Sequence, residues 1–378
     1  MPPSLPLPPG YETLAHSESL APRALIAHGR ALGIAAAGLA GLGMAGVAWG
    51  SVERHLPTVR HVDIPLGPGR DIAPLTILQV SDLHLYPGQD FLVAFLARVA
   101  EREDIDFVLS TGDNLGSADG VDLVRRAYAP LLHLPGAFVL GSNDYYSPVH
   151  KSWTAYLRRD PRIGDARFSA SGDLEDEYGS LPTPPPRRDP ATGTGGTPSS
   201  ASRGTLVPRS APDLPWRAVV ATMRDAGWTD LSNRSTTVGV PVRGASREAT
   251  LSLTGVDDPH LDRDRVPAPE PSWEDPGAAH VAVTHSPYVR VLNEFTALGA
   301  DLVVAGHTHG GQLGIPFMDP LVTNCDLPRH FGRGLHRWTH GTRSAWLNVS
   351  AGLGTSPFVP LRIAARPEVT VMHLRPGA

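Results

Sequence analysis

Residues 301–312 read DLVVAGHTHGGQ, an apolar run followed without a spacer by two histidines that stand between glycines. The apolar part predicts a buried strand, and the glycines free the backbone of the loop that follows. His307 and His309 can therefore direct both imidazoles into one pocket, and neutral imidazole binds Zn, Fe, Mn, Ni and Co. Because a His-x-His pair is also common without a metal, its interpretation depends on the rest of the chain.

Three earlier parts of the chain repeat the pattern of an apolar run followed by a polar loop. The runs are residues 75–80, 105–109 and 136–140, and residues 91–100 between the first two show helical spacing of apolar side chains. Ligand sites in open α/β sheets lie at the carboxyl ends of strands, so the recurrence is more informative than any single loop. The three loops carry, in chain order, Asp82 with His84, then Asp113, then Ser142, Asn143 and Asp144.

The second half of the chain continues the alternation of strands and helices. Residues 279–284 form another apolar run, which ends on His285. An amphipathic helix is expected at 214–226, β-type segments through 250–254, and closing strands at 345–349 and 369–374. Such alternation is typical of a layered α/β domain.

The strand-end loops together offer a set of nitrogen and oxygen ligands. This set is too large for one tetrahedral zinc and too rich in imidazole for calcium, but it suits two divalent transition-metal ions, Mn, Fe, Zn, Ni or Co, that share a carboxylate. Such a pair can orient an attacking hydroxide and neutralise charge on a phosphoryl group. The candidate metal ligands are Asp82, His84, Asp113, Asn143, His285, His307 and His309.

These motifs resemble, in number and order, the five motifs of the calcineurin-like metallophosphoesterases. The resemblance covers roughly residues 72–375 apart from one insertion, and GHTHGGQ is most similar to a bacterial subgroup that includes membrane-associated phosphodiesterases. It implies an α/β fold made of a two-sheet sandwich flanked by helices. It also implies that a metal-bridging hydroxide attacks a phosphomonoester or phosphodiester.

The resemblance further implies how the ligands divide between two ions. Asp113 would bridge the ions, because a carboxylate can use both of its oxygens. Asp82, His84 and His309 would hold the first ion, and Asn143, His285 and His307 the second. Read singly, Asp82 could instead cap a helix and Asp113 could stabilise a turn.

One loop departs from the family pattern, which usually reads Gly-Asn-His followed by Asp or Glu. This chain reads Gly141-Ser142-Asn143-Asp144. A Ser hydroxyl is a poor ligand beside imidazoles, so we expect Asn143 to reach the second metal and Asp144 to fall near the missing His, as a tentative catalytic acid. A metal-binding scaffold with lost or weak turnover is the alternative function.

Composition limits the function and the organisation of the chain. The 378 residues include 33 Lys and Arg against 38 Asp and Glu, a formal charge of −5 that argues against a nucleic-acid-binding surface. The single cysteine, Cys325, excludes an intramolecular disulfide framework. Residues 60–378 are expected to form the metallophosphoesterase domain. Pro, Gly, Ser and Thr make up about two thirds of residues 180–212, which predicts a flexible surface insertion.

The N-terminal region suggests attachment to a membrane. Residues 1–30 are expected to be a disordered tail, whereas residues 31–50 carry no charge and can cross a bilayer as a single helix. Arg23 and Arg30 precede this stretch, which favours a cell-membrane location with the catalytic domain outside the cytoplasm. A cleaved signal, or a helix packed on a cytoplasmic domain, remains the alternative. The expected partners are this membrane and a phosphate-ester substrate, a lipid or a nucleotide among them.

Three further polar stretches have more than one interpretation. Residues 257–260, DDPH, could line the site or form an ordinary turn. Residues 350–356, SAGLGTS, could approach phosphate through backbone N–H groups or form a glycine turn. The last set, in an Arg-rich stretch expected to be irregular, is predicted to lie on the surface and comprises His330, His336 and His340.

Overall fold

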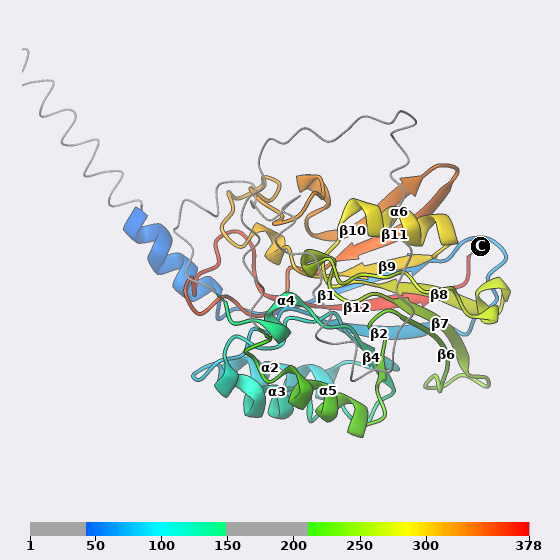
Figure 1. The fold of residues 1–378 in the computed structure, drawn as a ribbon, viewed down its shortest axis with the longest axis horizontal. Coiled ribbons are helices and arrows are strands. Elements are labelled where there is room, and N and C mark those ends of the chain that lie inside the picture. The colour runs from blue at the N-terminus through cyan, green and yellow to red at the C-terminus, as the bar shows by residue number, and fades with distance from the viewer. Residues whose placement is uncertain (1–42, 149–210, 378) are drawn as a thin grey trace, which may run out of the picture. The chain divides into compact units, whose positions relative to one another are not determined.

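The computed structural model describes residues 43–148 and 211–377 (Figure 1). The chain divides into two units, Met1–Trp49 and Gly50–Ala378, and the second unit holds both β-sheets. The predicted tail at 1–30, most of the stretch 31–50 and nearly all of the insertion 180–212 lie outside the described residues. The fold is the predicted α/β sandwich of two sheets flanked by helices (Figure 1).

The first sheet has six strands in the order β1-β12-β2-β3-β4-β5. Strands β2, β3, β4 and β5 run parallel, whereas β12 is antiparallel to β2 and parallel to β1. The last strand of the chain is therefore inserted between the first two. The bounds are β1 Thr58–Pro65, β2 Leu75–Val80, β3 Phe107–Ser110, β4 Gly136–Phe138, β5 Thr229–Asp230 and β12 Glu368–Arg375.

The second sheet also has six strands, in the order β10-β11-β9-β8-β7-β6. Its four central strands are parallel, and each edge strand is antiparallel to its neighbour. The bounds are β6 Arg234–Val240, β7 Ala249–Gly255, β8 Ala278–Val283, β9 Leu302–Ala305, β10 Gly334–His340 and β11 Arg343–Val349.

Helices cover the outer face of each sheet, so the domain has four layers (Figure 1). Apolar side chains of α2, α3 and α5 pack on the first sheet, and those of α6 pack on the second. The helix bounds are α2 Asp90–Arg102, α3 Val121–Tyr128, α4 Ser142–Tyr145, α5 Trp216–Asp225 and α6 Val289–Leu298.

A dry core fills the space between the two sheets. It joins inward side chains of the first sheet, such as Ile77 and Phe107, with those of the second, such as Leu253 and Val304. Because the central strands are buried on both faces, their sequences are continuous apolar runs. This burial explains why β2 and β9 are recognisable as apolar runs in the sequence. The polar loops begin where the buried part of each strand ends.

The stretch at the N-terminal end of the described chain is helical over residues 43–53. It carries exposed apolar side chains, among them Met44 and Val47. Within the described residues, no helix combines the length and the apolar character that crossing a membrane requires.

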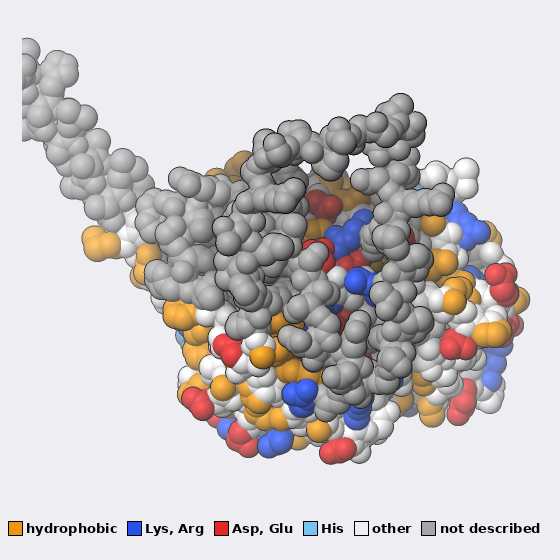
Figure 2. All heavy atoms as spheres, viewed as in Figure 1, with side chains coloured by type: hydrophobic (Ala, Val, Ile, Leu, Met, Phe, Trp, Pro, Cys, Tyr) orange, Lys and Arg blue, Asp and Glu red, His pale blue; other side chains and the backbone are white. Residues whose placement is uncertain are grey.

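The Arg-rich stretch near residue 335 is a strand rather than irregular chain. β10 contains both His336 and His340 and pairs with β11 in a hairpin. The prediction of irregular structure was wrong because this edge strand has only one buried residue, Trp338, and therefore lacks an apolar pattern. His330 and His340 are exposed, as predicted, while His336 is half-buried. Elsewhere, acidic and basic side chains are scattered among hydrophobic ones over the described part of the face in Figure 2.

Candidate metal centre

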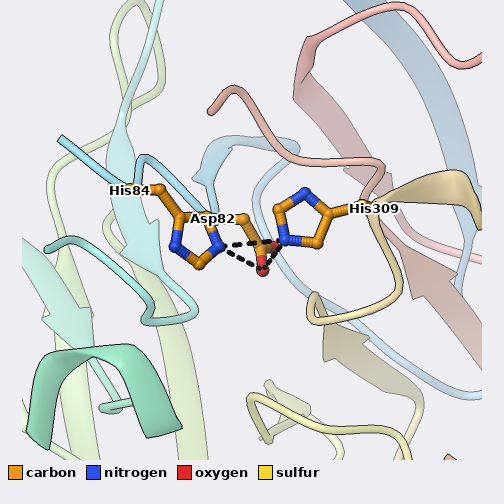
Figure 3. A group of neighbouring side chains, drawn as sticks. All are labelled: Asp82, His84 and His309. Carbon is orange, nitrogen blue, oxygen red and sulfur yellow. Dashed lines mark hydrogen bonds and ion pairs between the residues drawn. The ribbon is translucent and has the colours of Figure 1, made fainter. Parts of the chain in front are cut away.

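The first group of metal-type side chains comprises Asp82, His84 and His309 (Figure 3). Asp82 and His84 follow β2, and His309 follows β9 of the other sheet. His84 Nε2 lies 2.9 Å from His309 Nε2, and Asp82 Oδ1 lies 3.5 Å from His309 Nε2 and 4.0 Å from His84 Nε2. All three side chains are buried and direct a ligand atom to one point.

The second group comprises Asp82, Asp113 and His285. His285 follows β8, and its Nδ1 lies 2.7 Å from the carbonyl oxygen of Thr111. That contact places the proton on Nδ1, so the other ring nitrogen is left as the ligand atom. Nε2 is fully buried without a hydrogen-bond partner and lies 3.4 Å from Asp113 Oδ2. A buried, unpaired nitrogen that faces a carboxylate is what a metal ligand requires.

The His307 ring lies beside the second group. The centroid of its ring lies 5.2 Å from that of His285. Its Nε2 lies 3.2 Å from the carbonyl oxygen of Asn324, which assigns the proton to Nε2 and leaves Nδ1 as the potential ligand atom. Its backbone N–H donates to both oxygens of Asp82, 3.1 Å from each.

Asp82 is common to both groups, and Asp113, a member of the second group, also faces the first. Asp113 Oδ2 lies 3.4 Å from His84 Nε2 and 3.4 Å from His285 Nε2. One carboxylate oxygen therefore faces an imidazole of each group, which is the position of a shared ligand.

The loops that carry these residues have unusual backbone conformations. Five of the seven predicted ligands have positive φ, namely Asp82, His84, Asp113, His307 and His309, at values from 41° to 71°. Non-glycine residues rarely adopt this left-handed region, which costs about 1–3 kcal/mol each and is concentrated at functional sites. Asp and His tolerate it better than β-branched residues do, and it turns their side chains out of the strand direction toward the centre.

The loop 141–144 packs directly on the two groups. A Cβ at Gly141 would overlap Asp113 Oδ1 and lie 2.7 Å from His285 Nε2, so only glycine fits there. Asn143 donates its backbone N–H to Asp113 Oδ1 at 2.7 Å, while its side-chain Oδ1 accepts from Ser142 Oγ at 3.3 Å. The loop thus supports Asp113 through the backbone, and the role of the Asn143 side chain as a ligand stays a prediction.

Asp144 has contacts that differ from those expected of a catalytic acid. Its Oδ2 accepts backbone N–H groups of Asp113 and Gly141, and its Oδ1 accepts that of Asn114. Burial raises the pKa of Asp144 to about 6, and the Asp113 carboxylate adds to the rise, while N–H groups of Gly141 and Asn114 oppose it. The carboxylate therefore fastens two strand-end loops together. No sequence pattern indicates this role, because it depends on backbone groups about 30 residues away.

Burial and the neighbouring charges shift the pKa values of the imidazoles in the centre. Burial lowers the pKa of His84 and lowers that of His309 well below the usual range, which favours the neutral form of both rings. Burial acts in the same direction on His285, but the Asp113 carboxylate outweighs it and raises the pKa of His285 well above its ordinary value. A cation that binds beside Asp113 would displace that proton, as metal binding to histidine requires.

Arg362 is a neighbour of the centre that the sequence analysis missed. It is fully buried, and its Nη2 lies 3.3 Å from His309 Nδ1 and 2.7 Å from the carbonyl oxygen of Gly354. Burial lowers the pKa of Arg362 to about 10. The one sequence signal that could have found it is an arginine flanked by Leu361 and Ile363.

Two of the less certain polar stretches also have defined positions. Asp258, of the stretch 257–260, is fully buried and accepts from Ser286 Oγ at 2.6 Å, and the His260 ring centroid lies 4.7 Å from that of His307. This stretch therefore lies directly behind the second group.

The stretch 350–356 instead supports the first group. Its N–H groups at Leu353 and Gly354 donate to the carbonyl oxygens of Ser81 and Asp82. These two N–H groups are therefore used within the protein, which favours the glycine turn over a phosphate-binding loop.

The donor set fits divalent transition metals. It combines buried imidazole nitrogens with two carboxylates, and each three-residue group has one ligand atom per residue within 4.8 Å of the others. Imidazole with carboxylate is the set that Zn, Fe, Mn, Ni and Co share.

Comparison with known proteins finds similarity over part of the chain. Residues 75–187 match the family model described as calcineurin-like phosphoesterase. The chain is 37% identical over 75 residues to the uncharacterized metallophosphoesterase YkuE of Bacillus subtilis (strain 168), which is 20% of this chain and 24% of the relative. It is 29% identical over 126 residues to the uncharacterized protein YpbG of the same organism, which is 33% of this chain and 42% of the relative.

A solved structure of similar arrangement is that of TT1561 of Thermus thermophilus. The similarity covers 74% of this chain and 91% of that one, with 11% identity and a TM-score of 0.36. The chain spans 24% and 42% of the length of the two curated relatives. Residues 75–187, which include the loops of Asp82, Asp113 and Asn143, thus match the calcineurin-like phosphoesterase family.

Proposed function

We propose that the chain is a dinuclear metal-dependent phosphoesterase that hydrolyses a phosphomonoester or phosphodiester. The observation that carries this proposal is the position of Asp113 Oδ2, 3.4 Å from an imidazole nitrogen of each group. A shared oxygen holds two ions at the separation that phosphoryl transfer uses. Asp82, His84 and His309 would hold one ion, and His285, His307 and Asn143 the other.

The protein residues determine the charge of the site. Two divalent ions, when bound, supply Lewis acidity and lower the pKa of water. Only two of the seven proposed ligands, Asp82 and Asp113, are carboxylates, so the loaded centre keeps a net positive charge. This charge favours an anionic phosphate ester, whose alcohol part could be a lipid or a nucleoside.

The loop Gly141–Asp144 bears on which esters react fastest. It has no imidazole, and both oxygens of Asp144 accept backbone N–H groups. General acid help is typically worth about 10²–10⁴ in rate. We therefore expect the enzyme to favour aryl esters, whose leaving groups need little protonation, over alkyl esters.

The test is an assay of metal-reconstituted protein against matched aryl and alkyl phosphomonoesters and phosphodiesters. Asn143→Ala should lower the metal content of the second site, while Ser147→Ala, at an exposed position of the same segment, should not. Metal content unchanged by Asn143→Ala would refute the ligand assignment. A fully loaded wild type that hydrolyses no ester would favour the metal-binding scaffold instead.

We also infer that residues 31–50 attach the chain to the cell membrane, with the domain outside the cytoplasm. The uncharged sequence and the preceding Arg23 and Arg30 support this inference. Protease added to intact spheroplasts should then cut the domain. A domain that stays intact while an external control protein is cut would place it in the cytoplasm.

A further inference from the structure

The exposed apolar side chains of the domain are gathered rather than scattered. Among the described residues from Gly50 onward, every exposed large hydrophobic side chain lies in one of three short segments, residues 50–56, 312–318 and 358–365. Phe317 is the most exposed, at 105%, followed by Met318 at 57%. We call this set the apolar rim, and it comprises Val52, Leu56, Ile315, Phe317, Met318 and Phe358.

Backbone hydrogen bonds join the first and third segments. Arg362 N donates to the carbonyl oxygen of Gly50 at 3.1 Å. The buried Glu53 carboxylate accepts the N–H groups of Ala364 and Ala365 at 3.1 and 3.0 Å. Residues 50–56 are therefore fixed to the loop that carries Phe358.

The second segment is fixed to the same loop. Gly314 N donates to the carbonyl oxygen of Ile363 at 2.8 Å, and Gln312 Nε2 donates to that of Val359 at 2.8 Å. Figure 1 shows the loop after β9, in orange, and the loop after β11, in red, on the same side of the sheets. The three segments thus lie side by side.

These segments adjoin the metal centre. Gln312 N donates to the carbonyl oxygen of His309 at 3.0 Å, and Arg362 lies against the His309 ring. A large apolar body seated on the rim would therefore lie near the loop that carries His309.

Cationic side chains accompany the apolar rim. Arg54 donates to the carbonyl oxygen of Pro360, Arg333 to that of Ala364, and Arg366 to that of Leu56. Because carbonyl oxygens are uncharged, these hydrogen bonds do not neutralise the positive charges of the three guanidinium groups. Within the three described segments the acidic residue is the buried Glu53, and the exposed Asp319 follows the second segment, so the three arginines outnumber the acids near the rim.

We propose that the apolar rim is a membrane-binding surface that inserts Phe317 and Met318 into an anionic phospholipid bilayer. Apolar side chains beside arginines match the acyl and headgroup layers of such a surface, since apolar burial and attraction to anionic lipid act together. A fully exposed Phe protrudes, which suits insertion into lipid better than the flat face of a second copy. The first residue of the rim, Val52, also follows the uncharged stretch 31–50 closely in the sequence. This proposal concerns docking and stands whether or not the centre hydrolyses esters.

The test places an environment-sensitive fluorophore on the rim of the full chain. Phe317→Cys is labelled and compared with Thr342→Cys, an exposed position in the turn between β10 and β11. Wild type measures the background from Cys325, which is buried and whose thiol pKa burial raises to about 12, so it reacts slowly. Each protein is reconstituted with vesicles of phosphatidylcholine alone or of equal parts phosphatidylcholine and phosphatidylglycerol, and circular dichroism confirms folding.

The expected result is local to the rim and depends on the lipid charge. With phosphatidylglycerol the label at 317 should shift its emission to shorter wavelength and be quenched by doxyl-labelled lipid, while the label at 342 should do neither. An unchanged label at 317 on vesicle-bound protein overturns the proposal, and so does an equal response on phosphatidylcholine alone. A label already shifted without vesicles also overturns it, because the rim is then covered by another part of the chain or by a second copy.

Discussion

The metal-type residues combine a ligand role with a strained backbone. Asp82, His84, Asp113, His307 and His309 all have left-handed φ values, and each follows a buried strand. The cost, about 1–3 kcal/mol each, is tolerated because loop-to-loop hydrogen bonds hold the conformations. Hydrogen bonds between the loops therefore help to position the ligand side chains.

Asp113→Asn should weaken the binding of both ions rather than one. The carboxylate faces an imidazole of each group, and even the loss of a residue that only supports a ligand costs about 10–100-fold in metal affinity. Elemental analysis of the reconstituted variant measures this. Asp230→Asn, at another buried aspartate, should keep full metal content. Full metal content in Asp113→Asn would show that this oxygen is not shared.

Asp144→Asn should reduce stability even without metal. An amide can accept N–H groups only through its oxygen, so at least one of the donors at Asp113, Asn114 and Gly141 loses its partner, at a cost of about 1–3 kcal/mol. Urea unfolding of the metal-free variant and wild type measures the difference. Equal free energies of unfolding, with slower alkyl-ester hydrolysis alone, would favour the predicted role of Asp144 as a catalytic acid.

At the scale of elements, the loops contribute more to the candidate metal centre than the strands that precede them. The loop after β11 contains Gly352, at φ +67°, and a Cβ there would lie 2.5 Å from Asp82 Cβ. This loop therefore packs directly against the Asp82 side chain. It contributes to the centre without offering a ligand.

Gly352→Ala should therefore displace Asp82 and lower metal affinity as well as stability. Gly341→Ala is the matched control, because Gly341 also has positive φ, +59°, but has open space around its Cβ position. The control should lose only about 1–2 kcal/mol of backbone strain. Metal titration and urea unfolding of both variants separate the two effects. If both variants bind metal alike, the contact with Asp82 is unimportant.

Sequence patterns predicted the strands that are buried on both faces and the loops that follow them. β2 has the predicted bounds, and β8 and β9 differ by one residue, because apolar runs mark such strands directly. Edge strands such as β10 and the roles of Arg362 and Asp144 were not predictable in this way. They depend on contacts between residues distant in sequence, which leave no periodic pattern. The ligand assignment itself stays a prediction.

At the scale of the molecule, the two sheets meet at the candidate centre. Asp82, Asp113 and Asn143 follow strands of the first sheet, while His285, His307 and His309 follow strands of the second. Bound ions would therefore cross-link the two halves of the sandwich. The interface between the sheets would then depend on metal as well as on apolar packing.

Removal of metal should lower the melting temperature of the whole domain. An ion present at a thousand times its dissociation constant stabilises the folded state by about 4 kcal/mol, which corresponds to roughly 10 °C for a domain of this size. Calorimetry with and without a chelator measures the shift. The Asp113→Asn variant should show little further shift on chelation. A chelator without effect on the wild type would argue against ions shared by the two sheets.

The insertion of β12 between β1 and β2 also affects how the protein is made. The first sheet cannot be completed while β12, the last of its strands in the sequence, is still untranslated. Pairing between segments so distant in sequence is also slow. A growing chain would therefore leave the facing edges of β1 and β2 open until β12 has been synthesised. A chain destined for export could use this interval to cross the membrane before it folds.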